Sequence, residues 1–211
     1  MTLWDFFTHN REQILWATLE HLNLVATAML IAVLIGVPAG ILVTRKKWLE
    51  KPILGAANIA ETIPSLALLG FLLPLPWLGD RAERIAITAL ALYALLPIIR
   101  NTATGIAGVD SSVREAARGM GMTDAQILTK VELPLAFSYI LAGIRVATVL
   151  TIAIATVAAA VGAGGLGEFI FRGLAMVNNQ LILAGAIPAA LLALAADFLL
   201  GQLERRFRFT R

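Results

Sequence analysis

Apolar residues run through this chain in long blocks that are separated by short polar stretches. A helix needs about 20 apolar residues to cross roughly 30 Å of hydrocarbon. Five blocks are candidates, at approximately Leu22–Val43, Ile53–Leu75, Ile85–Ile99, Leu135–Val161 and Leu181–Leu203. The third block is short, and we expect flanking residues to extend it, with Arg84 and Arg100 reaching the membrane interfaces. The pattern predicts an all-α membrane protein with five transmembrane helices.

Lysine and arginine are unevenly divided between the two ends of these blocks. One side carries twelve: Arg45, Lys46, Lys47, Lys51, Arg100, Arg114, Arg118, Lys130, Arg205, Arg206, Arg208 and Arg211. The other side carries four: Arg11, Arg81, Arg84 and Arg172. Because positively charged loops tend to stay in the cytoplasm, we expect the N-terminus outside and the C-terminus inside. The chain then divides into an interfacial segment at 1–21, a transmembrane domain at 22–203 and a basic cytoplasmic tail at 204–211.

The composition supports a membrane protein and excludes several site chemistries. Charged residues make up 15% of the 211 residues and hydrophobic residues 59%, whereas soluble domains are roughly a quarter charged. The net charge of +3 arises at the ends of apolar blocks, so we expect no nucleic-acid partner. The chain has no cysteine, which excludes disulfides and thiolate metal sites. His9 and His21 show no metal-ligand pattern, and we expect both at the solvent or the membrane interface.

The polar loop at 110–134, between the third and fourth blocks, predicts a first short helix. Ser112 and Glu115 have the spacing of a capping box, which starts a helix. Gly119 and Gly121 are candidates for its left-handed C-terminal stop.

A second helix is predicted after the glycines. Thr123 and Gln126 again have the spacing of a capping box, and Leu133-Pro134 marks the turn into the fourth block. The loop should therefore form a helix, a glycine break and another helix on the cytoplasmic face.

The surface of the first helix is small and apolar. Ala116 and Ala117 would let a partner come close, and Val113 and Met120 lie one turn away. A helix this short is marginal alone, and docking into a partner's groove is one reason for its existence. A structured linker that touches only lipid headgroups is the other reading, and the residues alone leave both open.

The same loop resembles the EAA motif of ABC importer permeases. The matching residues are Glu115-Ala116-Ala117, then Gly121, then Val131-x-Leu133-Pro134, with Val131 where the family usually has isoleucine. The resemblance implies a type I ABC importer fold and makes this segment the coupling helix that sits in a cleft of the ATPase subunit. Glu115 then either contacts the ATPase or caps its own helix.

Further segments resemble the osmoprotectant branch of these permeases. They are Ile63–Gly70, Leu96–Thr102, Ala142–Ala147, Val161–Gly167 and Gly185–Ala190. The resemblance implies transport of quaternary ammonium compounds such as glycine betaine, carnitine and choline. It also implies a bacterial-type inner or plasma membrane, an external substrate-binding protein, and a second permease copy in a homodimer or paralogous heterodimer, surrounded by membrane lipids.

The chain itself is not expected to be an enzyme or to bind a cofactor. No G-x-x-x-x-G-K-[ST] segment occurs, so ATP and Mg²⁺ should bind a separate ATPase subunit. Gly162-Ala-Gly164-Gly165-Leu-Gly167 matches a dinucleotide pattern, but that site needs a preceding strand and a βαβ unit. We therefore interpret these glycines as a flexible or re-entrant element, with an outer gate as a candidate role.

Three charged residues fall inside the blocks: Glu61, Arg145 and Asp197. Charges at matching depth in a membrane tend to pair or to face an aqueous path. We expect Arg145 to neutralise one or both carboxylates, either as a structural pair or as part of a pore-lining network.

Tyr93 and Tyr139 are the candidate aromatic residues on a substrate path. Quaternary ammonium groups favour aromatic faces, although most membrane tyrosines only pack or lie at interfaces.

Two rival functions remain open on the sequence. The first is an ABC permease for another small solute, such as methionine. The second is an ATP-independent secondary transporter, which typically shows inverted repeats and functional charges near the midplane. That reading leaves the loop from Glu115 to Pro134 unexplained.

Overall fold

The computed structural model describes residues 3–76, 78 and 81–207. The described chain is helical, with connecting turns. The elements are α1 (Leu3–His9), α2 (Arg11–Arg45), α3 (Lys47–Thr62), α4 (Ser65–Leu72), α5 (Ala82–Ala107), α6 (Ser111–Gly119), α7 (Asp124–Ile127), the π-helical η1 (Leu128–Glu132), α8 (Leu133–Ala158), the 3₁₀ turn η2 (Ala159–Val161), α9 (Gly167–Ala175) and α10 (Asn179–Arg206).

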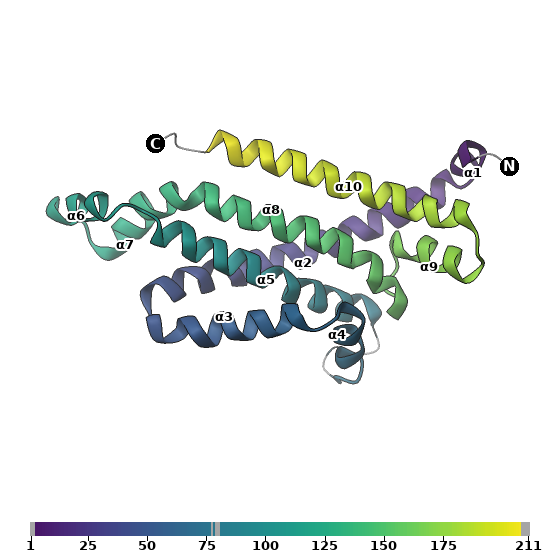
Figure 1. Ribbon diagram of the computed structural model, residues 1–211, viewed down its shortest axis with the longest axis horizontal. Helices are drawn as coiled ribbons and strands as arrows, with labels where there is room; N and C mark the ends of the chain where they lie inside the picture. The colour runs from purple at the N-terminus through teal and green to yellow at the C-terminus, as the bar shows by residue number, and fades with distance from the viewer. Residues whose placement is uncertain (1–2, 77, 79–80, 208–211) are drawn as a thin grey trace.

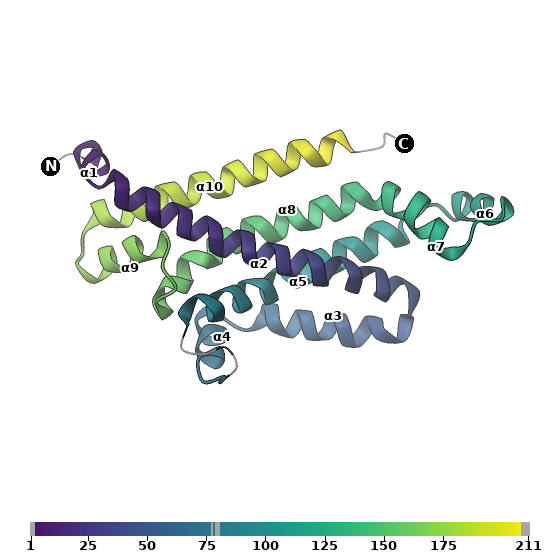
Figure 2. The ribbon, with the colours of Figure 1, turned by 180° about the vertical axis from the view of Figure 1, so that it is seen from behind.

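The long helices lie along one axis and form an elongated bundle (Figure 1). Figures 1 and 2 place α1 and α9 at one end, and α6, α7 and the C-terminal end of α10 at the other. The turn between α2 and α3 lies toward the α6 end. Three separate parts of the chain that are rich in arginine or lysine thus share one end of the bundle.

Within the described ranges, four helices are long and apolar enough to cross a membrane: α2, α5, the continuous helix Asp124–Val161, and α10. A fifth crossing requires α3 and α4 together, and these two helices meet at an angle of 104°. The predicted all-α chain with five crossings is confirmed when the bent pair of α3 and α4 is counted as one crossing. The predicted span at Ile53–Leu75 is broken at Pro64, which disfavours helical backbone at Ile63, whose ψ is 128°.

Glycine allows the long helices to approach closely. A Cβ atom on Gly40 of α2 would lie 2.6 Å from Cβ of Thr102 in α5, and one on Gly143 of α8 would lie 2.6 Å from Cβ of Asn101. Small residues at helix contacts are typical of membrane bundles, where packing rather than water drives association. α5 therefore lies at the centre, between α2 and α8.

The first transmembrane helix begins earlier than the hydropathy pattern indicates. α2 starts at Arg11, so half of the expected interfacial segment is the first three turns of this helix. His21 lies on a packed face and is fully buried, and its Nε2 is 3.1 Å from the carbonyl oxygen of Ile152 in α8. The expectation that His21 lies at the solvent or the interface is therefore wrong, whereas His9 is exposed.

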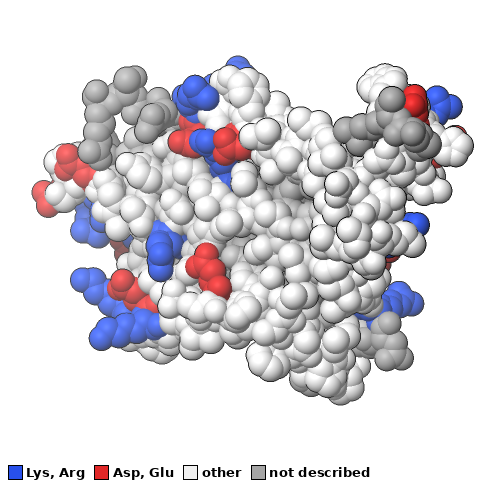
Figure 3. Space-filling model, turned by 45° about the vertical axis from the view of Figure 1, so that its right-hand side comes forward, with Lys and Arg blue, Asp and Glu red and all other residues white. Residues whose placement is uncertain are grey.

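Charged side chains gather mostly toward the two ends of the face in Figure 3, and a broad uncharged region lies between them. The third predicted span is longer than its apolar run, since α5 extends over Ala82–Ala107. Residues 208–211 of the predicted basic tail lie outside the described residues, and its first part, Glu204–Arg206, continues α10.

Candidate functional site

The polar segment at the end of the bundle begins with α6. Asp110 is the N-cap, and its carboxylate accepts a hydrogen bond from the backbone N–H of Ser112 at 2.9 Å. The predicted Ser112–Glu115 capping box is therefore wrong, since aspartate two residues earlier already binds a free amide of the first turn. Glu115 is exposed and forms no hydrogen bond or ion pair within the described residues, so it does not cap its own helix.

The helix α6 ends in a Schellman motif at Gly121. The N–H of Met122 donates to the carbonyl of Ala117 at 3.2 Å, and the N–H of Gly121 donates to that of Arg118 at 2.9 Å. Gly121 has a φ of +80°, a conformation that glycine adopts without the steric cost of a Cβ atom. Gly121 is thus the predicted left-handed stop, whereas Gly119 is an ordinary residue of the last helical turn.

The second predicted capping box is confirmed. The N–H of Gln126 donates to Oγ1 of Thr123 at 3.3 Å, and the N–H of Thr123 donates to Oε1 of Gln126 at 2.8 Å. The helix that starts here does not turn before the membrane, because α7, η1 and α8 are continuous. The expected turn at Leu133-Pro134 is therefore wrong: Pro134 is the second residue of α8 and lies within this continuous helix.

One face of α6 is apolar and uncovered. Val113 is 40% exposed, Met120 is 75% exposed, and Ala116 between them is exposed. The spacing of three and four residues places these side chains on one helical stripe. Ala117, which we expected beside Ala116 on the docking surface, is buried at 2% exposure and anchors α6 to the segment behind it.

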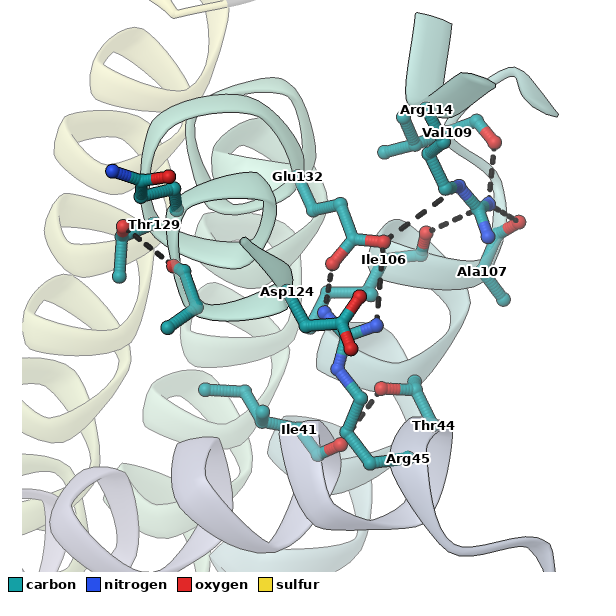
Figure 4. A network of polar contacts seen from close by, with 12 residues as sticks. Ile41, Thr44, Arg45, Ile106, Ala107, Val109, Arg114, Asp124, Thr129 and Glu132 are labelled. Atoms are coloured by element: carbon teal, nitrogen blue, oxygen red, sulfur yellow. Dashed lines mark hydrogen bonds and ion pairs between the residues drawn. The ribbon is translucent and has the colours of Figure 1, made fainter. Parts of the chain in front are cut away.

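An ion-pair network fixes this segment to the transmembrane helices (Figure 4). The carboxylate of Glu132, 1% exposed, accepts from both terminal nitrogens of Arg45. Nε of Arg114 lies 3.7 Å from the same carboxylate. Arg114 also donates to the carbonyls of Ile106 and Ala107 at 3.4 and 3.0 Å and to that of Val109.

The sequence pattern does not reveal this network. The available signal was a lone carboxylate at Glu132 between Val131 and Leu133, at the border of an apolar block. Charged residues at such borders are common, however, and the sequence does not show that two distant arginines meet there.

The intramembrane charges form a different cluster from the expected one. Arg145 of α8 donates from Nε and a terminal nitrogen to both oxygens of Asp197 in α10, at 2.7 and 2.9 Å. Its other terminal nitrogen donates to Glu204 at 3.2 Å. Gly201 makes room for this guanidinium, because a Cβ atom there would lie 3.1 Å from it. The Arg145–Asp197 pair is as predicted, whereas Glu61 is exposed on α3 and has no ion pair among the described residues.

The glycine-rich segment is a tight turn packed on α2. Gly162, Gly164 and Gly165 have φ values of +81°, +80° and +79°. The N–H of Gly165 donates to a carboxylate oxygen of Glu20 at 3.1 Å. The fourth glycine, Gly167, begins α9 where a Cβ atom would lie 1.9 Å from the carbonyl oxygen of Thr156. Contacts and backbone conformation account for these glycines, and the gate role stays a prediction.

The two candidate tyrosines have different surroundings. Tyr93 is buried, and its hydroxyl donates to the carbonyl of Ile63, which the bend between α3 and α4 frees from the helical ladder. Tyr139 is 50% exposed on α8. Tyr93 therefore has a structural role, and a place on a substrate path stays a prediction for both. Among the described residues, no three or more His, Asp or Glu side chains gather in a way that could hold a metal ion.

A bundle of up to five crossings that presents a helix, a glycine turn and a second helix at its arginine-rich end is a multi-pass membrane protein. Residues 22–209 match the family described as binding-protein-dependent transport system inner membrane component. The chain belongs to this family, and it is an inner-membrane protein.

Characterised relatives align along nearly the whole chain. The carnitine transport permease OpuCB of Listeria monocytogenes is 46% identical over 201 residues, covering 95% of this chain and 91% of that one. The choline transport system permease OpuBB of Bacillus subtilis is 43% identical, covering 96% and 92%. The osmoprotectant import permease OsmW of Salmonella typhimurium is 46% identical, covering 89% and 88%.

Solved structures confirm the type I ABC importer fold. A chain of the inward-facing MetNI methionine ABC transporter superposes with a TM-score of 0.82 at 24% identity, covering 94% of this chain and 99% of that one. A chain of an amino acid ABC transporter crystallised with histidines gives a TM-score of 0.77 at 22% identity, covering 98% and 100%. At these identities the likeness establishes the fold alone.

Proposed function

We propose that this chain is the permease subunit of an ABC importer for quaternary ammonium osmoprotectants of the glycine betaine, carnitine and choline type. The observation that carries the substrate class is the identity of 43–46% to permeases named for carnitine, choline and osmoprotectants. This identity extends across almost the whole chain. The methionine transporter shares the fold at 24% identity, which carries no argument about substrate.

The exposed stripe of α6 is the surface for the ATPase subunit. A short amphipathic helix fits a groove of a partner, and α6 stands at the end of the bundle with Val113, Ala116 and Met120 uncovered. Glu115 lies on the same helix, free to bind that partner. ATP and Mg²⁺ bind the ATPase subunit, and this chain converts the movement of the ATPase into a movement of its own helices.

The remaining partners are expected because the substrate needs a pathway through the membrane. Five crossings do not enclose a route through the membrane, so a second permease copy, identical or closely related, completes it. A substrate-loaded binding protein docks at the end that holds α1 and α9. ATP and the loaded binding protein can change the conformation of the complex because they favour a different state from the resting one.

The orientation is testable on a chain without native cysteine. The positive charge at the α6 end supports a cytoplasmic location for that end. Single cysteines at two exposed positions, Thr8→Cys in α1 and Ser112→Cys in α6, should differ in intact cells. A membrane-impermeant maleimide should label the first directly and the second only after permeabilisation, and the reverse result would invert the topology.

Uptake into proteoliposomes tests the function. The vesicles contain this chain with its ATPase and binding protein, and receive labelled glycine betaine, carnitine, choline or methionine. Uptake of a quaternary ammonium compound that requires hydrolysable ATP is the expected result. Methionine uptake alone would overturn the substrate class, and uptake without ATP or the ATPase would overturn the importer mechanism in favour of a secondary transporter.

A further inference from the structure

Glu132 is the only buried acidic side chain among the residues that the structure describes. Burying a carboxylate is costly unless cations and hydrogen bonds compensate it. Arg45 supplies a two-point hydrogen-bonded contact, and Arg114 adds a second positive charge at 3.7 Å. The carboxylate is therefore held by two cations that come from different parts of the chain.

The three residues join elements that are otherwise separate (Figure 4). Arg45 is the last residue of α2, Arg114 lies in α6, and Glu132 ends η1 just before α8. Arg114 also binds carbonyls at the C-terminal end of α5. Nε of Arg114 is buried and has no hydrogen bond in the described structure, so the ion pair with Glu132 is what compensates its burial.

The short π-helical segment η1 ends at Glu132. In η1 the N–H of Leu133 donates to the carbonyl of Leu128, five residues earlier. A π-helical turn contains one residue more than an α-helical turn, and each α-helical residue advances about 100° around the axis. A regular α-helix here would change the rotation of α7 relative to α8. Such π-helical insertions frequently lie at functional sites.

The docking helix has few other attachments. Its apolar stripe faces away from the bundle, and Ala117 is its only buried residue within the described helix. Besides the chain connections to α5 and at the turn of Gly121, α6 is held by the burial of Ala117, by Arg114 and by the exposed Arg118–Asp124 ion pair at 3.9 Å. Among these contacts, Arg114 reaches α5 directly through the carbonyls, and α2 through Glu132 and Arg45.

We propose that Glu132 is a positioning residue for coupling: it transmits movement of the docked α6 to α2 and α8 by clamping Arg114 and Arg45 together. The proposal rests on the proposed function, because it assumes that an ATPase moves α6. Glu132 would act through the two arginines that it binds. Its loss should leave docking in place and disconnect ATP hydrolysis from transport.

The test compares Glu132→Gln with Glu50→Gln in the reconstituted complex. Glu50 is an exposed carboxylate on α3 at the same end of the bundle, with no ion pair within the described residues. Three quantities are measured for each complex: co-purification of the ATPase, ATP hydrolysis stimulated by loaded binding protein, and substrate imported per ATP hydrolysed. A purely structural defect lowers the amount of active complex and leaves the last ratio unchanged.

We expect Glu132→Gln to retain the ATPase subunits while the substrate imported per ATP falls at least about fivefold, the lower end of usual coupling factors. Glu50→Gln should keep the native ratio. A native ratio in Glu132→Gln would overturn the proposal. If Glu132→Gln does not accumulate, the same ratio is measured for Glu132→Asp, which keeps the charge and shortens the side chain. A lowered ratio in that variant supports the proposal, and a native ratio overturns it. A native complex that imports none of the osmoprotectants would instead refute the proposed function.

Discussion

Replacing Gly167 with alanine is expected to push α9 away from the end of α8. The added Cβ atom would lie 1.9 Å from the carbonyl oxygen of Thr156 and 2.8 Å from Cβ of Ala159. Ordinary contacts of a methyl group begin near 3.4 Å, so the two segments must separate by more than 1 Å. Backbone rather than a flexible side chain forms the obstacle, and relaxation is correspondingly limited.

The expected loss of stability is compared with the effect of a matched glycine substitution elsewhere in the same chain. Overpacking costs about 1–3 kcal/mol, and we expect the upper end, about 3 kcal/mol, because the clash is with a carbonyl. Gly55→Ala in α3 adds the same methyl group where nothing lies within 4 Å. That change should stabilise the helix by roughly 0.5–1 kcal/mol. The two variants should therefore differ by roughly 3–4 kcal/mol.

Thermal unfolding of the purified chain in detergent measures this difference. One kcal/mol shifts the Tm by roughly 2–4 °C for a chain of this size, so the two midpoints should differ by roughly 6–16 °C. Equal midpoints, or a higher midpoint for Gly167→Ala, would show that α9 is not packed on α8 as described. The reasoning that assigns the glycine-rich segment to close packing would then fail.

Three further predictions concern single contacts. Tyr93→Phe should lower the free energy of unfolding by about 1–2 kcal/mol, because the carbonyl of Ile63 loses its donor; chemical denaturation measures this loss. Met120→Asp should abolish co-purification of the ATPase without lowering the Tm, because the side chain is 75% exposed. Arg145→Asp and Asp197→Arg should each reduce the yield of folded chain, and the double variant should recover part of it, because the pair is restored with its charges exchanged.

Each of these has a control. Tyr93→Leu removes the hydroxyl and the ring, and should destabilise more than Tyr93→Phe; equal losses would mean that the hydroxyl contributes nothing. Met120→Leu keeps the apolar surface, and a loss of ATPase binding equal to that of Met120→Asp would contradict docking through this stripe. A double Arg145–Asp197 variant no better than either single one would show that the two residues do not act as a pair.

Hydropathy was sufficient to predict the number of crossings, because each one needs a long apolar run whatever its neighbours are. It was not sufficient to predict the bend between α3 and α4. Pro38, Pro97 and Pro188 lie inside continuous helices, whereas the helix stops at Pro64. The sequence around these prolines does not distinguish them. The difference lies in a tertiary contact: the hydroxyl of Tyr93 donates to the carbonyl of Ile63, which the bend leaves without a helical partner.

The parts of the candidate site that are formed by residues close together in the sequence were predictable. Gly121 and the Thr123–Gln126 box are read from neighbouring residues, and both are found in place. Pairings between distant residues were not predictable. Glu204 was assigned to the tail because the apolar run ends at Leu203, yet α10 continues to Arg206 and brings Glu204 two turns from Asp197. The side chain can therefore reach Arg145.

The continuity of α7, η1 and α8 has a geometric consequence. The helix Asp124–Val161 has 38 residues, and at 1.5 Å per residue it is about 57 Å long. It begins beside the docking stripe and ends at the glycine-rich turn on the far end of the bundle. In a rigid helix of this length, a tilt of about 5° around one end displaces the other end by about 5 Å. Under the proposed coupling, a small tilt of this helix around Glu132 would displace its other end, at the glycine-rich turn, by several ångströms.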